Sequence, residues 1–134
     1  MNKMPSLNYS PELMKHFKHP KYVKKIKNPD GVGEVGNVAC GDIMHLEIKV
    51  EKNKIKDIGF RTFGCAAAIA SSDVVCEIAK GKTLSQAEKI SKDNIIKKLK
   101  GMPPIKMHCS VLGIETLKKA IADYNQNKLN RRQK

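Results

Sequence analysis

The residues that decide the fold are Ile43–Phe63, with the sequence IMHLEIKVEKNKIKDIGFRTF. In the first half, apolar and polar side chains alternate, which is typical of a strand with one buried face. The apolar set is Met44, Leu46, Ile48 and Val50. A turn at Lys52–Lys54 then leads into a second strand, Ile55–Phe63, in which Ile58 and Phe60 face inward. So short a connection predicts an antiparallel hairpin.

The chain after the hairpin predicts a series of helices. An apolar helix over Ala66–Lys80 stops at a glycine, and Ser85–Glu88 reads as a capping box that opens a short helix. Asp93 caps another helix that ends at Lys100, and an amphipathic helix over about Ser110–Asn125 closes the domain. Strands followed by helices predict an α+β fold, a small antiparallel sheet with helices packed on one face.

The chain before the hairpin predicts little regular structure. Ser10 is a good N-cap with Pro11 at the first helical position, so a short helix should run to about Phe17. Lys18–Gly36 is interrupted by prolines and glycines and predicts mostly loop or irregular extended chain. From these patterns we expect a disordered N-terminus at residues 1–8, a single domain at 9–125 and a basic C-terminal tail at 126–134.

Composition indicates a globular protein of one domain. The chain has 134 residues, of which 40% are hydrophobic and 29% charged. Its uncharged stretches are shorter than the roughly 18 residues of a membrane span, so we expect a cytoplasmic protein with reduced thiols. The cysteines then suggest metal binding or catalysis rather than disulfides. They are Cys40, Cys65, Cys76 and Cys109.

The net charge of +13 raises the possibility of nucleic-acid binding. The lysines are scattered, however, aromatic residues make up only 4%, and there is no tryptophan to form a stacking platform. Helix-turn-helix and zinc-finger spacings are also absent from the sequence. We therefore expect no nucleic-acid partner, and interpret the charge as a lysine-rich surface that attracts acidic protein partners.

Three cysteines lie where predicted elements begin or end. Cys40 is in the loop before the first hairpin strand and Cys65 follows the second, so an antiparallel hairpin brings both to one end of the sheet. Cys109 lies at the start of the last helix, after an arm stiffened by two adjacent prolines. The helix N-terminus, with Lys106 and His108 nearby, should favour its thiolate. This predicts a metal site at one end of the sheet.

The candidate ligands suit a soft metal centre. Three thiolates without a C-x-x-C pair make a poor structural zinc site, but with Asp42 or His108 they could hold an iron–sulfur cluster or a zinc ion. The choice between these two as fourth ligand stays open. A carboxylate is a hard ligand, so a site that uses Asp42 would be suited to releasing its metal.

Three motifs resemble those of a known family. They are C-G-D at Cys40–Asp42, T-F-G-C-A-A-A-I-A-S-S at Thr62–Ser72 and M-P-P-I-K-M-H-C-S at Met102–Ser110. Together they closely resemble the NifU/IscU-type iron–sulfur cluster assembly scaffolds, over about Tyr9–Tyr124. The resemblance implies an α+β scaffold, not an enzyme. On such a scaffold a transient 2Fe–2S cluster would be built from iron, cysteine-derived persulfide sulfur and electrons, and then passed to apo-proteins.

The resemblance also implies site residues and partners. Cys40, Cys65 and Cys109 would be cluster ligands or sulfur acceptors, with Asp42 and His108 as the other polar site residues. Cys109 is the expected first sulfur acceptor because its surroundings best stabilise a thiolate, and Cys65 is the alternative acceptor. The implied partners are a cysteine desulfurase, an electron donor such as a ferredoxin and apo-iron–sulfur proteins. The scaffold would be a monomer or a cluster-bridged dimer, with no membrane partner.

Departures from the family pattern leave alternatives open. Ala66 stands where the family usually has glycine. The chaperone-recognition motif Leu-Pro-Pro-Val-Lys is changed at Met102 and Ile105, which leaves an Hsp70-type chaperone as an open partner. The alternative function is a zinc-organised sulfur acceptor, a sulfurtransferase component with zinc at the same site. The presence of His108 argues against that branch, and visible absorption after anaerobic reconstitution separates the two.

Other candidate residues have simpler interpretations. Cys76 lies on the apolar side of its helix and is expected to pack in the core. His45 is on the polar face of its strand and is expected to be solvated. His16 and His19 are expected to be surface residues in a lysine-rich region. Lys106 is expected to balance the negative charge of the site.

Overall fold

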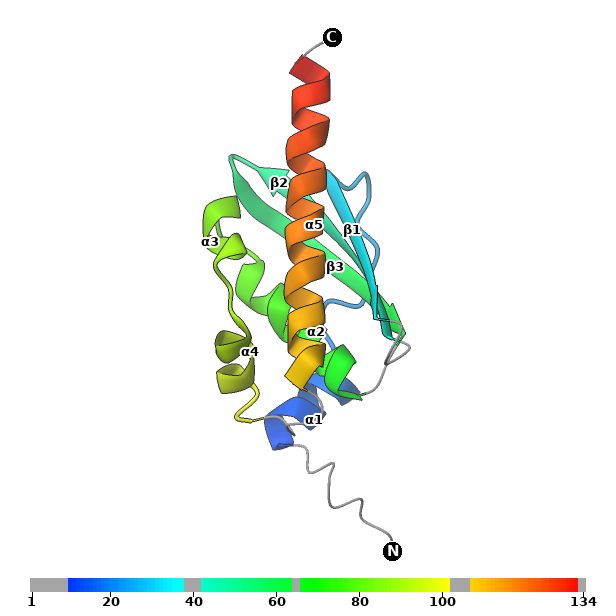
Figure 1. The fold of residues 1–134 in the computed structure, drawn as a ribbon, viewed down its shortest axis with the longest axis vertical. Helices are drawn as coiled ribbons and strands as arrows, with labels where there is room; N and C mark the ends of the chain where they lie inside the picture. The colour runs from blue at the N-terminus through cyan, green and yellow to red at the C-terminus, as the bar shows by residue number, and fades with distance from the viewer. Residues whose placement is uncertain (1–9, 38–41, 64–65, 102–106, 133–134) are drawn as a thin grey trace, which may run out of the picture.

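The computed structural model describes residues 10–37, 42–63, 66–101 and 107–132 (Figure 1). Within these ranges, three strands form an antiparallel sheet in the order β1-β2-β3, and α2 and α5 pack against one of its faces. This confirms the predicted α+β fold. The elements in chain order are α1 (Pro11–Lys18), β1 (Gly31–Asn37), β2 (Asp42–Glu51), β3 (Lys54–Phe63), α2 (Ala66–Ala79), α3 (Leu84–Glu88), α4 (Lys92–Lys98) and α5 (Met107–Arg132).

The hairpin of β2 and β3 is the one predicted from the alternating pattern. Met44, Leu46 and Ile48 are fully buried. Together with the buried residues of β3 they form the sheet side of the hydrophobic core; these are Ile55, Ile58 and Phe60. The connecting residues Lys52 and Asn53 have φ angles of 53° and 63°. Positive φ angles at both residues are typical of a two-residue hairpin turn whose twist matches that of the paired strands.

Strand β1 occupies the last part of the region predicted to be mostly loop or irregular extended chain. Between Lys18 and Gly31 no helix or strand is assigned, but from Gly31 onward the prediction was wrong. The reason is the close approach of α5 to two glycines on β1. A Cβ atom at Gly33 would lie 2.4 Å from the carbonyl oxygen of Thr116, and one at Gly31 would lie 2.3 Å from that of Ala120. The glycines that suggested a loop are required because the helix backbone packs directly on the strand.

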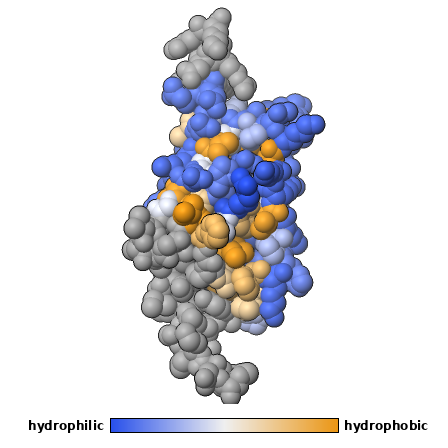
Figure 2. Space-filling model, turned by 90° about the vertical axis from the view of Figure 1, so that its right-hand side faces the viewer, coloured by the Kyte–Doolittle hydropathy of each residue, from blue (hydrophilic) through white to orange (hydrophobic). Residues whose placement is uncertain are grey.

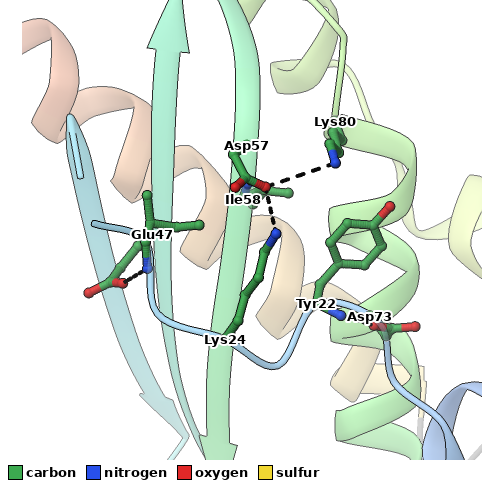
Figure 3. A network of polar contacts seen from close by, with 8 residues as sticks. Tyr22, Lys24, Glu47, Asp57, Ile58, Asp73 and Lys80 are labelled. Atoms are coloured by element: carbon green, nitrogen blue, oxygen red, sulfur yellow. Dashed lines mark hydrogen bonds and ion pairs between the residues drawn. The ribbon is translucent and has the colours of Figure 1, made fainter. Parts of the chain in front are cut away.

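The segment between α1 and β1 crosses the outer face of the sheet. Val23 forms a parallel bridge with Phe60 at the edge strand β3. The chain then passes over Gly59, where a Cβ atom would lie 2.3 Å from the carbonyl oxygen of Lys24. Farther along the segment, the backbone N–H of Ile26 donates a hydrogen bond to the Glu47 carboxylate of β2, with an N···O distance of 2.9 Å. Figure 3 shows this path together with the side chains that hold it.

The capping residues of the short helices differ from the prediction. Ser10 caps α1 as expected, accepting the N–H of Leu13. The capping box of α3, however, is formed by Thr83 and Gln86 rather than by Ser85 and Glu88. That of α4 is formed by Ser91 and Asn94, with Asp93 in the first turn. Overlapping S/T-x-x-E/Q/N patterns allow several registers, and the extended backbone before each helix decides between them.

Helix α5 is longer than predicted at both ends. It begins at Met107 instead of about Ser110, and it continues beyond Asn125 to Arg132. No glycine or proline follows Asn125 to end the helix, so the basic residues expected as a tail extend it. Figure 1 shows the C-terminal turns of α5 projecting past the sheet.

Candidate functional site

Two of the connections that contain cysteines leave the sheet at the same end. β1 ends opposite Asp42, the first residue of β2. The next residue, Ile43, pairs with Phe63, the last residue of β3. The described backbone on both sides of Cys40 and just before Cys65 therefore lies at one end of the sheet (Figure 1). Cys40 and Cys65 themselves lie outside the described residues.

Helix α5 starts near that same end. It runs antiparallel to β1, since Gly31 lies against Ala120, whereas Gly33, farther along the strand, lies against Thr116. The end of β1 therefore lies toward the first turn of α5. That turn contains the backbone of Cys109. Figure 1 shows the start of α5 at the lower end of the molecule, where β1 and β3 also end.

The remaining candidates belong to the same region of the chain. Asp42 opens β2, and His108 lies in the first turn of α5; the structure describes the backbone of both. Lys106 lies outside the described residues. α2 begins at Ala66, directly after Cys65. Two helix N-termini therefore point their positive partial charge toward this end, which favours thiolates there.

The outer face of the sheet is hollowed beside this end. A shallow cavity of about 280 Å³ is lined by Glu34, Ile43, His45, Arg61, Thr62 and Phe63. The apolar residues Ile43 and Phe63 are 47% and 80% exposed. Figure 2 views the side that is on the right in Figure 1 and shows apolar side chains among charged ones, with a larger apolar area in its lower half. The candidate end of the sheet thus presents mixed apolar and charged surface.

His45 is not the freely solvated residue predicted from its strand face. Its Nδ1 lies 3.2 Å from Glu34 Oε1 and its Nε2 lies 3.1 Å from Glu47 Oε2. Glu34 is its cross-strand partner, which explains the contact. Burial alone would raise the pKa of Glu47, but hydrogen bonds from the Ile26 N–H and from His45 outweigh it, and the pKa is lowered.

The predicted ligand set stays a prediction. Among the side chains that the structure describes, no group of three or more His, Cys, Asp or Glu could hold a metal ion. The predicted ligands all lie outside that set of side chains: Cys40, Asp42, Cys65, His108 and Cys109. Their chemistry, three soft thiolates with a carboxylate or an imidazole, fits iron–sulfur or zinc binding.

Cys76 packs in the core, as predicted. It is completely buried within α2, in the main core. Burial, and the nearby carboxylate of Asp73, raise the pKa of its thiol well above the ordinary value. A neutral buried thiol is neither a good nucleophile nor a good metal ligand.

The contact between His16 and Asp73 was missed by sequence reasoning. His16 is largely buried, with Nδ1 2.7 Å from Asp73 Oδ2, so the expectation of a surface residue was wrong. His19 is exposed, as expected. The available signal was an acidic residue within the apolar sequence of α2, because a carboxylate at such a position needs a partner.

Comparison with known proteins identifies the family. Residues 8–131 match the model of the NifU-like N-terminal domain. The chain belongs to the NifU/IscU family of iron–sulfur cluster assembly scaffolds. It is 53% identical over 116 residues to the iron–sulfur cluster assembly scaffold protein IscU 1 of Archaeoglobus fulgidus, covering 87% of this chain and 76% of the relative. The IscU scaffold of Buchnera aphidicola from Acyrthosiphon pisum is 45% identical over 126 residues, covering 91% and 98%.

Solved structures of NifU/IscU-like proteins share the fold. One is a candidate cluster assembly scaffold for the SUF system from Fervidobacterium islandicum, with a TM-score of 0.72 and 30% identity, covering 84% of this chain and 96% of that one. The N-terminal NifU-like protein of Brucella abortus has a TM-score of 0.74 at 15% identity, covering 87% and 93%, and shows the fold alone. In the described part of this family member, no helix is long and apolar enough to cross a bilayer.

Proposed function

We propose that this chain is a scaffold on which a 2Fe–2S cluster is assembled from iron and persulfide sulfur and from which it passes to apo-proteins. Family membership supports the proposal, as do the relatives named as cluster assembly scaffolds. One structural observation carries it. The described elements that flank Cys40 and Cys65, and the first turn of α5 that contains Cys109, lie at one end of the sheet.

The thiolates of Cys40, Cys65 and Cys109 would bind the iron of the growing cluster. Soft sulfur ligands suit iron–sulfur centres, and the two nearby helix N-termini lower the cost of gathering negative charge. The fourth position would fall to Asp42 or His108. Either would be a weaker ligand to such a centre than a further thiolate, which suits a cluster that must later leave.

Sulfur would arrive as a persulfide on a cysteine desulfurase. The thiolate of Cys109 attacks the outer sulfur of that persulfide, so the donor S–S bond breaks, a new S–S bond forms on Cys109 and the donor is left as a thiolate. Each transferred sulfur becomes sulfide when two electrons, one from each of two reduced ferredoxins, cleave its S–S bond and leave the cysteine as a thiolate. Lys106 would balance the negative charge, and Cys65 is the rival acceptor. The acceptors of the finished cluster are apo-iron–sulfur proteins.

Anaerobic assembly tests this function. The protein is incubated with ferrous iron, cysteine, a cysteine desulfurase and a dithiol reductant that supplies the electrons, and both visible absorption and acid-labile sulfide are measured. We expect a cluster on the wild type and on Cys76→Ala, and none that is stable on Cys40→Ser, Cys65→Ser or Cys109→Ser. Retained zinc with transferable sulfur but no visible absorption would favour the zinc-organised sulfur acceptor instead.

A further inference from the structure

A second hollow lies on the helical side of the molecule. A groove of about 520 Å³ runs between the end of α2 and the helices α3 and α4. Figure 1 shows α3 and α4 on the far side of α5 from β1, away from the end of the sheet where β1 and β3 stop. The groove is lined by Ile78, Lys82, Gln86, Lys89, Ile90, Asn94, Lys97 and Lys98.

The charge of this groove is of one sign. Its lining holds four lysines and no acidic residue. Lys98 forms an ion pair with Glu77 at 3.2 Å. Within the described part of the chain, Lys82, Lys89 and Lys97 take part in no ion pair. Like charges gathered in a concave surface produce a positive potential that attracts carboxylates.

The polar side chains of the groove are already used inside the protein. The side chain of Gln86 accepts the N–H of Thr83 at 3.1 Å, and that of Asn94 accepts the N–H of Ser91 at 2.9 Å. Their capping boxes also occupy the backbone N–H groups of Gln86 and Asn94, so these helix starts have fewer free N–H donors for a phosphate. The lining also has no aromatic ring on which a base could stack. A nucleotide or nucleic acid is therefore a poor match.

The rest of the lining is aliphatic. Ile90 is buried at the base of the groove, and Ile78 is half-buried beside it. An occupant that places an aliphatic side chain here would remove mainly the exposed part of Ile78 from water, with a small contribution from Ile90. The lysine ammonium groups on the rim would meet carboxylates on either side, because lysine acts as a mobile point charge that tolerates varied geometry.

We infer that the groove between α2, α3 and α4 docks an acidic segment of a partner protein, in which carboxylates flank aliphatic side chains. The aliphatic side chains contact Ile78 and Ile90, and the carboxylates pair with Lys82, Lys89 and Lys97. Such a partner leaves the cysteine end of the sheet uncovered. The inference does not depend on cluster assembly and can be tested on the protein without iron.

The test uses a short blocked peptide in which glutamates flank leucines, and a second peptide in which every glutamate is glutamine. Binding is followed by backbone amide NMR shifts and by fluorescence anisotropy at low and high salt. We expect the acidic peptide to shift amides in α3, α4 and the end of α2, and the neutral peptide to leave them unchanged. Affinity should fall with salt because the contacts are charge pairs near the surface.

Matched variants localise the effect. Lys89→Glu with Lys97→Glu reverses two charges in the groove and should weaken binding about tenfold, or by about 1.4 kcal/mol. Lys118→Glu with Lys119→Glu makes the same charge change on the exposed surface of α5, where Lys119 lies beside β1, and should leave affinity unchanged. Equal weakening in both pairs would overturn the inference. So would absence of peptide binding, or tighter binding of a single-stranded or duplex oligonucleotide to the same amides.

Discussion

The Nδ1 atom of His16 lies 2.7 Å from the Oδ2 atom of Asp73, a carboxylate that is fully buried in α2. The other oxygen of Asp73 accepts the backbone N–H groups of Lys21 at 2.8 Å and Tyr22 at 3.0 Å. One buried side chain therefore joins α1, the segment that follows it and α2. Figure 3 shows Asp73 beneath Tyr22 at the start of the segment that crosses the sheet.

Removing this carboxylate should destabilise the fold strongly. Asp73→Ala leaves the N–H groups of Lys21 and Tyr22 and the ring of His16 without their buried partner, so we expect the free energy of unfolding to fall by about 3 kcal/mol. Urea denaturation measures it. Asp93→Ala, an exposed position in the first turn of α4, should cost about 0.5 kcal/mol. Similar losses in the two variants would show that Asp73 does not hold these elements together.

The sequence predicts the parts of this fold that are governed by local periodicity. The hairpin followed from the alternation around Leu46, and α2 from its apolar run, because burial imposes those patterns directly. β1 was missed because Gly33 reflects contact with α5, more than eighty residues away in the chain. Asp73 was missed for the same reason, since its partners in α1 and the following segment are distant in sequence.

The candidate site also has features that local sequence patterns predict and features that depend on contacts distant in the chain. Antiparallel pairing alone placed the connections that hold Cys40 and Cys65 at one end of the sheet, and the register confirms the pairing of the strands that flank them. Whether a histidine is solvated or bridged depends on neighbours across strands, so the position of His45 between Glu34 and Glu47 could not be read from alternation. The contacts of the cysteine side chains stay a prediction.

A methyl group at Gly33 should separate β1 from α5. Gly33→Ala places a Cβ atom 2.4 Å from the carbonyl oxygen of Thr116 and 2.7 Å from the backbone nitrogen of Ala120. Because both are backbone atoms, the strand must shift, and we expect a loss of about 1–3 kcal/mol in the free energy of unfolding. Amide hydrogen exchange should quicken in β1 first. Glu34→Gln, at the exposed neighbouring position, keeps an oxygen acceptor for His45 and serves as the control, and equal exchange in both would contradict the packing argument.

Stability should fall in mild acid partly through Glu47. Burial would raise the pKa of this carboxyl, but the Ile26 N–H and His45 lower it below its ordinary value of 4.5. A group with a lowered pKa in the folded state stabilises the fold above its unfolded pKa, and this contribution disappears as the pH falls through the folded value. Between about pH 5 and pH 3, Glu47→Gln should therefore lose less stability than the wild type.

Urea denaturation at several pH values measures this difference. Glu115→Gln, at an exposed position on α5, is the matched control and should follow the wild-type profile. If Glu47→Gln lost as much stability as the wild type over this range, the carboxylate would not be the acid-sensitive group.

The last prediction concerns release of the cluster, and it rests on the proposed scaffold function. Asp42 opens β2 at the end of the sheet, two residues after Cys40. A carboxylate there, on the metal or beside it, is the hard member of a soft ligand set and can dissociate to admit water or an incoming thiolate. Asp42→Ala should then form a cluster that persists several-fold longer in air and transfers several-fold more slowly to an apo-ferredoxin.

The register offers a matched control for Asp42. Asn37 is its cross-strand partner at the same end of the sheet and is not a proposed ligand, so Asn37→Ala should leave cluster lifetime and transfer unchanged. Both rates can be followed by visible absorption in a single experiment with each variant. If Asp42→Ala lost its cluster faster than the wild type, Asp42 would serve to hold the cluster or to support the adjoining connection, because only a ligand that promotes release lengthens cluster lifetime when it is removed.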